Sequence, residues 1–174
     1  MVMGWVGTPD IETQLPAFLP QLRLARERDQ PITIHALKAW EPLFDALRQE
    51  APPTRGFLLH SFGGSRETAT RLSRLGARFS FSGYFLHSRK ASTLAVYSSI
   101  PRDRLLLETD APTMTPPAEF IDFPMADGTN HPANLPAIAR GLASALQVDA
   151  ASLAQDCLDN TRQFFDSSKR HFPP

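Results

Sequence analysis

The chain has 174 residues, of which 42% are hydrophobic, so it can bury one sizeable core, and we expect a single domain over residues 1–174. Eighteen basic residues balance eighteen acidic ones, which argues against a global electrostatic attraction to nucleic acid or membranes. The single cysteine, Cys157, excludes an internal disulfide and indicates a reducing compartment, which we take to be the cytoplasm. Residues 1–7 lack the basic and long apolar stretches of a signal peptide or a membrane span.

The first predicted element is an amphipathic helix that runs to about Arg28. Its apolar face carries Leu15, Phe18, Leu19 and Leu22 at helical spacing. Thr13 is the expected N-cap, which places Pro16 in the first turn. Pro20 lies deeper, where a proline is expected to bend the helix.

Two strand–helix units follow. Short apolar runs at residues 31–35 and 56–60 predict buried strands. After the first run, apolar residues between 40 and 47 repeat at helical spacing, and after the second a helix is expected to be capped by Ser65 and to stop at Gly76. The chain therefore repeats a β/α unit.

The remaining expected elements are a strand at 78–83, a helix at 89–99, a strand at 105–108 and a proline-rich loop at 110–132. Two helices at 135–146 and 153–165 and a frayed tail at 167–174 follow. Strands that alternate with helices predict a parallel sheet with helices outside it, either an open doubly wound sheet or a barrel. The pattern alone does not choose between these two. The chain contains no glycine-rich phosphate loop, which counts against a nucleotide-binding doubly wound fold.

Potential metal ligands lie at the ends of three predicted strands: His35, His60 and Asp110. In a (β/α) barrel all strands run the same way, so the groups that follow them surround one mouth. The period of two puts Glu108 and Asp110 on the same face of the fourth strand. Imidazole and carboxylate donors suit Zn²⁺, Mn²⁺ and similar ions, and such sites commonly hold the water for a hydrolysis. A single histidine at a strand end is more often a structural residue, so the prediction depends on the whole set.

Several short motifs follow one another along nearly the whole chain. They are His35 after its apolar strand, His60–Gly64, Phe81–Gly83, Leu106–Pro112, Asn130–Leu135 and Asn160–Phe165. In order and spacing, these motifs resemble those of the TatD family of metal-dependent deoxyribonucleases. The segment from Glu108 to Pro112 is the most specific of them.

The resemblance implies a TIM-like (β/α) barrel of the metal-dependent hydrolase type. Its mouth would hold divalent metal ions (Mg²⁺, Mn²⁺ or Zn²⁺), two in a complete site, and would hydrolyse phosphodiester bonds in DNA or in a small phosphodiester. On this resemblance His35, His60 and Asp110 are the metal ligands. Asp110 also handles the proton of the attacking water, and Glu108 orients the site.

Residues outside this set are candidates for substrate contact. The resemblance gives this role to Asn130 and His131, and a loop cap is the equally favoured alternative. Arg89, Lys90 and residues 102–104 could approach phosphates, although solvated surface charge is the better default.

The chain departs from the family at its start. TatD-like enzymes also have a His-x-His pair on the first strand and a metal-bridging glutamate on the third, and no His-x-His occurs in this chain. A TIM barrel takes roughly 250 residues, so we expect a barrel that is incomplete at its N-terminus and a native enzyme longer than this sequence. Because an opened barrel exposes strand edges and inward apolar faces, it invites self-association through that edge or disorder.

Two alternatives to a metal-dependent deoxyribonuclease stay open. A non-catalytic barrel remnant would associate through its exposed edge and show no metal-stimulated cleavage. An amidohydrolase would use a similar set of histidines and aspartates to cleave C–N bonds. No membrane partner is expected for any of the three.

Overall fold

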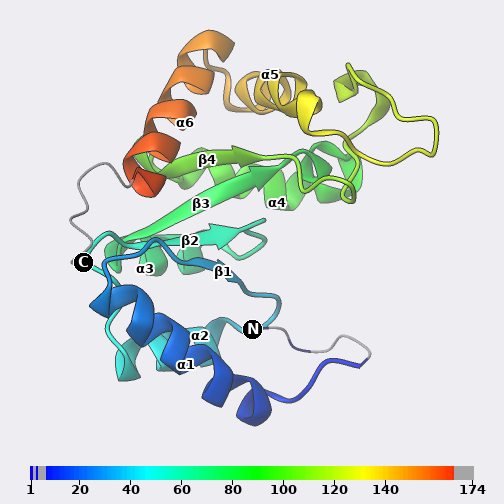
Figure 1. Ribbon diagram of the computed structural model, residues 1–174. Coiled ribbons are helices and arrows are strands. Elements are labelled where there is room, and N and C mark those ends of the chain that lie inside the picture. The colour runs from blue at the N-terminus through cyan, green and yellow to red at the C-terminus, as the bar shows by residue number, and fades with distance from the viewer. Residues whose placement is uncertain (2, 4–6, 167–174) are drawn as a thin grey trace, which may run out of the picture.

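The structure is a computed structural model and describes residues 1, 3 and 7–166. Its centre is a parallel sheet in which the strands pair in sequence order: β1 (Thr33–His35), β2 (Phe57–His60), β3 (Ala77–Ser82) and β4 (Leu105–Glu108). Within the described residues β1 and β4 form the two edges, so the sheet is open. All four strands point the same way in Figure 1, and their carboxyl ends meet at one edge.

Helices surround this sheet. They are α1 (Ile11–Glu27), α2 (Trp40–Gln49), α3 (Arg66–Arg74), α4 (Ala91–Val96), α5 (Leu135–Leu146) and α6 (Ala150–Phe165). Short 3₁₀ helices are η1 (Gly83–Leu86), η2 (Ser88–Lys90), η3 (Tyr97–Ser99), η4 (Arg102–Arg104), η5 (Ala118–Phe120) and η6 (Pro132–Asn134). The first two α-helices lie on the β1 side of the sheet, and α5 and α6 lie against β4 (Figure 1).

The two faces of the sheet differ in chemistry because side chains alternate along a strand. One face contributes buried apolar side chains to the main core, among them Ile34, Leu59, Phe79 and Phe81. The opposite face carries His35, His60, Ser80 and Glu108 toward the carboxyl edge. Farther back on this second face, Leu58 and Leu106 pack with Phe164 of α6 in a small separate cluster.

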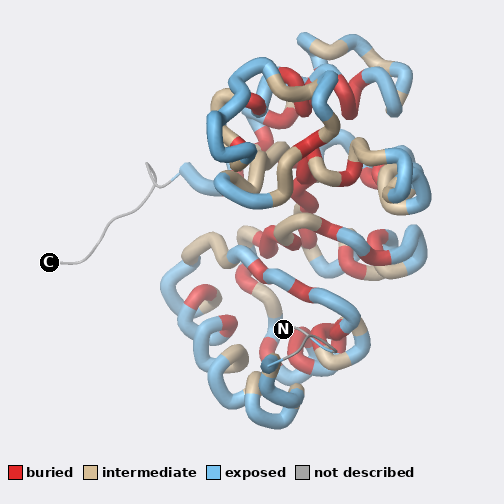
Figure 2. Tube along the Cα trace, turned by 90° about the vertical axis from the view of Figure 1, so that its right-hand side faces the viewer, coloured by how far each residue is buried: buried red, intermediate tan, exposed pale blue. Residues whose placement is uncertain are grey.

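The main core joins the helices to the sheet and extends along the chain from Leu22 to Cys157. Figure 2 shows buried segments gathered inside the molecule and exposed segments on its outer turns. Cys157 is buried, as predicted, and burial raises the pKa of its thiol to about 12. Among the residues that the structure describes, no helix is long and apolar enough to cross a membrane.

The start of α1 corrects the sequence prediction. The N-cap is Asp10, whose carboxylate accepts a hydrogen bond from the Thr13 backbone N–H at 2.8 Å. Thr13 therefore lies in the first turn and is not the cap. Aspartate is as strong a capping residue as serine, and its use here moves Pro16 and Pro20 deeper into the helix than expected.

Two glycines bring together the turns that precede β2 and β3. Gly56 has φ +81° and Gly76 has φ +90°, in the left-handed region that favours glycine. A Cβ atom on Gly56 would lie 2.1 Å from the Gly76 carbonyl oxygen. The helix between these turns begins after its cap, Ser65, and ends at Arg74, close to the predicted stop. The predicted frayed tail at 167–174 lies outside the described residues.

Candidate metal centre

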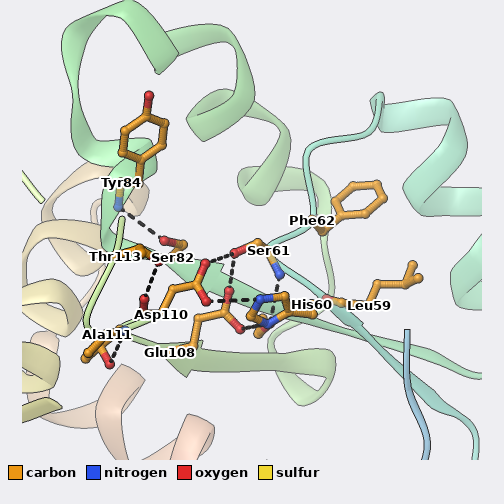
Figure 3. A network of polar contacts seen from close by, with 12 residues as sticks. Leu59, His60, Ser61, Phe62, Ser82, Tyr84, Glu108, Asp110, Ala111 and Thr113 are labelled. Carbon is orange, nitrogen blue, oxygen red and sulfur yellow. Dashed lines mark hydrogen bonds and ion pairs between the residues drawn. The ribbon is translucent and has the colours of Figure 1, made fainter. Parts of the chain in front are cut away.

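Three predicted site residues meet at the carboxyl edge of the sheet. The two ring nitrogens of His60 face two carboxylates: Nδ1 lies 2.7 Å from Oε2 of Glu108, and Nε2 lies 3.2 Å from Oδ1 of Asp110. In Figure 3, dashed lines join the His60 ring to both carboxylates. One potential ligand atom from each residue lies within 4.8 Å of those of the other two. His60 ends β2 and Glu108 ends β4, so the cluster spans the strand between them.

Glu108 is held from several sides. The Ser61 hydroxyl donates to Oε1, and the Ser80 hydroxyl donates to Oε2. Burial raises the pKa of the Glu108 carboxyl, but the hydrogen bonds from His60, Ser61 and Ser80 together outweigh it and lower the pKa. Glu108 is therefore a fixed carboxylate whose hydrogen bonds orient its neighbours.

His60 has an unusual environment for a histidine. The hydrogen bond to Glu108, with a further contribution from Asp110, raises the pKa of the imidazole above its ordinary value of 6.5 despite partial burial. With both nitrogens facing carboxylates, the ring is suited to carry a positive charge, either its own second proton or a cation.

The backbone at the cluster is unusual as well. Ser61 has φ +45° and Asp110 has φ +59°, both in the left-handed region that non-glycine residues seldom occupy. Each follows a strand that carries a cluster residue. Such conformations concentrate at functional sites, where the surrounding structure enforces them.

The third predicted metal ligand, His35, lies beside the cluster. Parallel pairing of β1 with β2 places His35 opposite His60, and the two ring centroids are 5.6 Å apart. Burial lowers the pKa of His35, and the positive charges of His60 and of the Met1 amino group lower it further. A neutral imidazole is the form that binds metals, and His35 stays a predicted ligand.

The donor set fits a divalent cation. An imidazole nitrogen and two carboxylates converge without a neutralising lysine or arginine that pairs with them among the described residues. The second nitrogen of His60 hydrogen-bonds to a carboxylate, as is usual for metal-binding histidines. Nitrogen and oxygen donors of this kind suit Zn²⁺ and Mn²⁺.

The two serines were missed in the sequence. Ser61 belongs to the motif that begins at His60, but nothing in the motif indicates that its hydroxyl reaches β4. Ser80 gave a signal that could have been used, because it alternates with Phe79 and Phe81 in a buried strand between the two ligand-bearing strands. A small hydroxyl at such a position points toward the same face as the ligands.

The predicted substrate-contact residues lie in the loop that follows β4. Asn130 is buried, and its side-chain N–H groups donate to the carbonyl oxygens of Thr109 (2.7 Å) and Met114 (3.4 Å). Nδ1 of His131 accepts from the Ala133 backbone N–H at 3.1 Å and thereby caps η6. These are the bonds of the loop-cap alternative, and substrate contact stays a prediction for both residues.

The basic residues separate in space. Arg89 and Lys90 lie over the ring of Tyr84, which follows β3 at the carboxyl edge. Arg104 instead donates to the carbonyl oxygen of Ala77 at the start of β3, at the opposite edge. Of the basic residues singled out in the sequence, Arg89 and Lys90 are thus at the edge that carries the cluster.

Comparison with known proteins agrees with this geometry. A family model described as TatD related DNase matches residues 4–166. The chain belongs to the TatD family. It is 33% identical over 166 residues to the uncharacterized metal-dependent hydrolase YcfH of Escherichia coli strain K12, covering 94% of this chain and 60% of that protein. It is 35% identical over 153 residues to the 3'-5' ssDNA/RNA exonuclease TatD of Edwardsiella piscicida, covering 87% of this chain and 58% of that protein.

The TatD fold is also confirmed by a solved structure. The TatD homologue YJJV from Escherichia coli superposes with a TM-score of 0.79 at 29% identity, over 89% of this chain and 57% of that one. The expected TIM-like architecture is therefore confirmed, with four parallel barrel strands that do not close a barrel in the described residues. This TatD family chain spans about 60% of the length of the curated relatives that it matches.

Proposed function

We propose that this TatD family chain carries part of the active site of a metal-dependent phosphodiesterase that cleaves DNA. The observation that carries the proposal is the position of His60 between the carboxylates of Glu108 and Asp110. Relatives named as single-stranded DNA and RNA exonucleases support the choice of a phosphodiester substrate. Because the chain spans about 60% of those relatives, the activity of the whole protein is part of the proposal.

The proposed metal ligands are His60, Asp110 and His35, and a complete site would hold two ions. A bound divalent cation would supply Lewis acidity at a phosphoryl oxygen and would lower the pKa of a water molecule. His60 offers Nε2, because its Nδ1 is taken by Glu108. Asp110 offers Oδ1 on the same side of that ring.

Glu108 is proposed to position the site. Its carboxylate accepts hydrogen bonds from Nδ1–H of His60 and from the hydroxyls of Ser61 and Ser80, which fixes the orientation of the imidazole. With a cation bound, a ring oriented in this way would present Nε2 to it in the unprotonated form. Glu108 therefore acts through His60.

Asp110 has the second proposed role, as acceptor of a proton from the attacking water. Its Oδ2 faces the Ser61 hydroxyl at 3.5 Å, which is too long for a strong hydrogen bond, so this oxygen keeps accepting capacity. The left-handed backbone at Asp110 turns the chain immediately after the strand and fixes the carboxylate at the edge.

The setting of the activity completes the proposal. We place the enzyme in the cytoplasm, because its cysteine is single and buried. DNA is the proposed partner, and a small phosphodiester is the alternative substrate.

The experiment is metal-dependent cleavage of labelled single-stranded DNA with Mg²⁺, Mn²⁺ or Zn²⁺. We expect Asp110→Ala to reduce the rate at least about 100-fold. Asp127→Ala is the matched control, because Asp127 is an exposed loop aspartate that bonds Thr129, and its rate should equal that of the unmodified chain. Equal behaviour of the unmodified chain and Asp110→Ala would overturn the proposal.

A further inference from the structure

An exposed aromatic side chain stands in the long loop between β4 and α5. Phe123 is 52% exposed, and Met125, two residues later, is 44% exposed. A single exposed apolar residue is common and needs no explanation. Phe123 differs because its backbone is fixed on both sides.

Two sets of bonds hold this part of the loop. The Asn134 side chain, which is fully buried, accepts from the Phe123 backbone N–H at 2.8 Å and donates to the Phe123 carbonyl oxygen at 3.3 Å. At the preceding residue, Asp122 accepts two hydrogen bonds from Arg140 of α5, at 3.0 and 2.8 Å. The Phe123 ring is therefore presented outward from a fixed backbone position.

The Asn134 side chain also connects the Phe123 backbone to the end of β4. Asn134 donates to Oδ1 of Asn130 at 3.2 Å, and Asn130 donates to the Thr109 carbonyl oxygen at 2.7 Å. Thr109 lies between Glu108 and Asp110 in the chain. Two buried asparagines thus tie the loop to the strand end that carries the carboxylates.

A second ring lies next to Phe123. The centroid of the His131 ring is 6.1 Å away, and the two ring planes are inclined by 32°. The loop from 110 to 132 has four acidic residues and neither lysine nor arginine. Arg140 of α5 is already paired with Asp122, so this loop offers a phosphate group no unpaired lysine or arginine within the described residues, and a nucleic acid would contact it through a base.

We propose that Phe123 and His131 form a stacking platform for an unpaired base of a single-stranded nucleic acid. The inference rests on the proposed function, which supplies the phosphodiester substrate. Aromatic side chains bind unpaired bases by stacking, with little dependence on sequence because every base has a π-face. The platform would hold one base of the strand while a phosphodiester bond lies at the metal centre.

The test is binding of fluorescein-labelled oligothymidylate to the full chain in EDTA, followed by fluorescence anisotropy. We expect Phe123→Ala to raise Kd by roughly 5- to 150-fold, the range for loss of one base–aromatic stack. Phe123→Trp should restore the affinity of the unmodified chain, and its indole fluorescence should be quenched on binding. In a series of oligonucleotides that each carry one abasic nucleotide at a different position, the unmodified chain should bind one member more weakly. Phe123→Ala should bind all members with the same affinity.

Phe165→Ala is the matched control. Phe165 is also an exposed phenylalanine, 43% exposed, with an aromatic neighbour, Phe164, at 4.8 Å. It lies toward the amino-terminal ends of the strands, where Arg55, which precedes β2, donates to the Phe164 carbonyl oxygen. Its Kd should equal that of the unmodified chain.

Several results would overturn the platform: an unchanged Kd in Phe123→Ala, an equal loss in Phe165→Ala, or a flat abasic scan. Hydrolysis of the base-free diester dimethyl phosphate or of DNA is scored separately, with Asp110→Ala beside the unmodified chain. Binding that depends on the position of the abasic nucleotide, without any hydrolysis, would support the platform and contradict the proposed function. Hydrolysis that requires Asp110, with equal affinity at every abasic position, would support the proposed function and contradict the platform.

Discussion

At the scale of single residues, the chemistry of this chain depends on one imidazole between two carboxylates. Among the residues that the structure describes, the two ring nitrogens of His60 are paired with the carboxylates of Glu108 and Asp110, an arrangement that suits a positive charge on the ring. Protons and metal ions therefore compete for the same place on the ring. This competition gives the cluster a dependence on pH that can be measured without activity.

The first prediction concerns stability against pH in the absence of metal. The pKa of His60 is raised in the folded protein, mainly by the hydrogen bond to Glu108, so its contribution is fully present below the unfolded value of 6.5. The contribution is lost as the pH rises through the raised pKa. Urea unfolding in EDTA should therefore show that the stability difference between the unmodified chain and His60→Gln shrinks as the pH increases above about 6.5. A difference that stays constant from pH 6 to pH 9 would contradict this.

Tyr97 gives a second prediction at this scale. It is fully buried, and its hydroxyl donates to the carbonyl oxygens of Phe62 (2.8 Å) and Ser80 (2.9 Å), which lie next to the cluster. Burial, with the nearby charge of Glu108, raises the pKa of this phenol well above its ordinary value, so it stays a donor. Tyr97→Phe should lower the free energy of unfolding by about 1–3 kcal/mol, because it leaves buried carbonyl groups unsatisfied. Denaturant titration at pH 7 measures this, and an unchanged midpoint would refute it.

At the scale of elements, the strand ends are what the sequence predicts best. Apolar runs that stop at His35 and His60 define both strands, and parallel strands that run the same way bring the residues after them to one edge. The hydrogen bonds around Glu108 could not be predicted, because the contribution of Ser80 depends on the register between β3 and β4. The predicted start of α1 was wrong because two good capping residues, Asp10 and Thr13, lie three positions apart.

The turns ahead of β2 and β3 yield a prediction at the element scale. Gly56→Ala should cost at least about 2 kcal/mol, because alanine is strained at positive φ and its Cβ would meet the backbone of Gly76. Gly63→Ala is the control, since Gly63 is exposed and an added Cβ would have no neighbour within 4 Å. Its effect should stay within about 0.5 kcal/mol. Thermal or urea unfolding of both variants checks this, and equal losses would contradict it.

At the scale of the whole molecule, metal binding should add to the stability of the fold, because the cluster joins β2 to β4 across the sheet. A ligand present at 100 times its Kd stabilises the native state by about 2.7 kcal/mol, or roughly 5–10 °C in Tm for a chain of this length. We expect this shift with Mn²⁺ or Zn²⁺ in the unmodified chain. His60→Ala should lose it.

His87→Ala is the control for the metal shift. The His87 ring contacts the carbonyl oxygen of Thr115 and does not belong to the cluster, so this variant should keep the full shift. Differential scanning calorimetry with and without the ion measures all three proteins. A shift of equal size in His60→Ala would place the bound ion elsewhere.

Self-association through the open barrel edge stays a prediction. Within the described residues no strand pairs with the outer side of β1 or β4, although the Met1 amino group donates to the His35 carbonyl oxygen and the Asn160 side chain donates to that of Leu105. Sedimentation equilibrium over a range of concentrations measures the mass. A monomer at every concentration would contradict the expectation.

The position of β3 has a consequence for how the protein assembles. Because β3 separates the strands that carry His60 and Glu108, the imidazole and the carboxylate meet only after both neighbouring strand pairs have formed. Parallel pairings across such sequence separations form slowly. We therefore expect His60 to meet its carboxylates late in folding, so that proton uptake by His60 should accompany completion of the sheet.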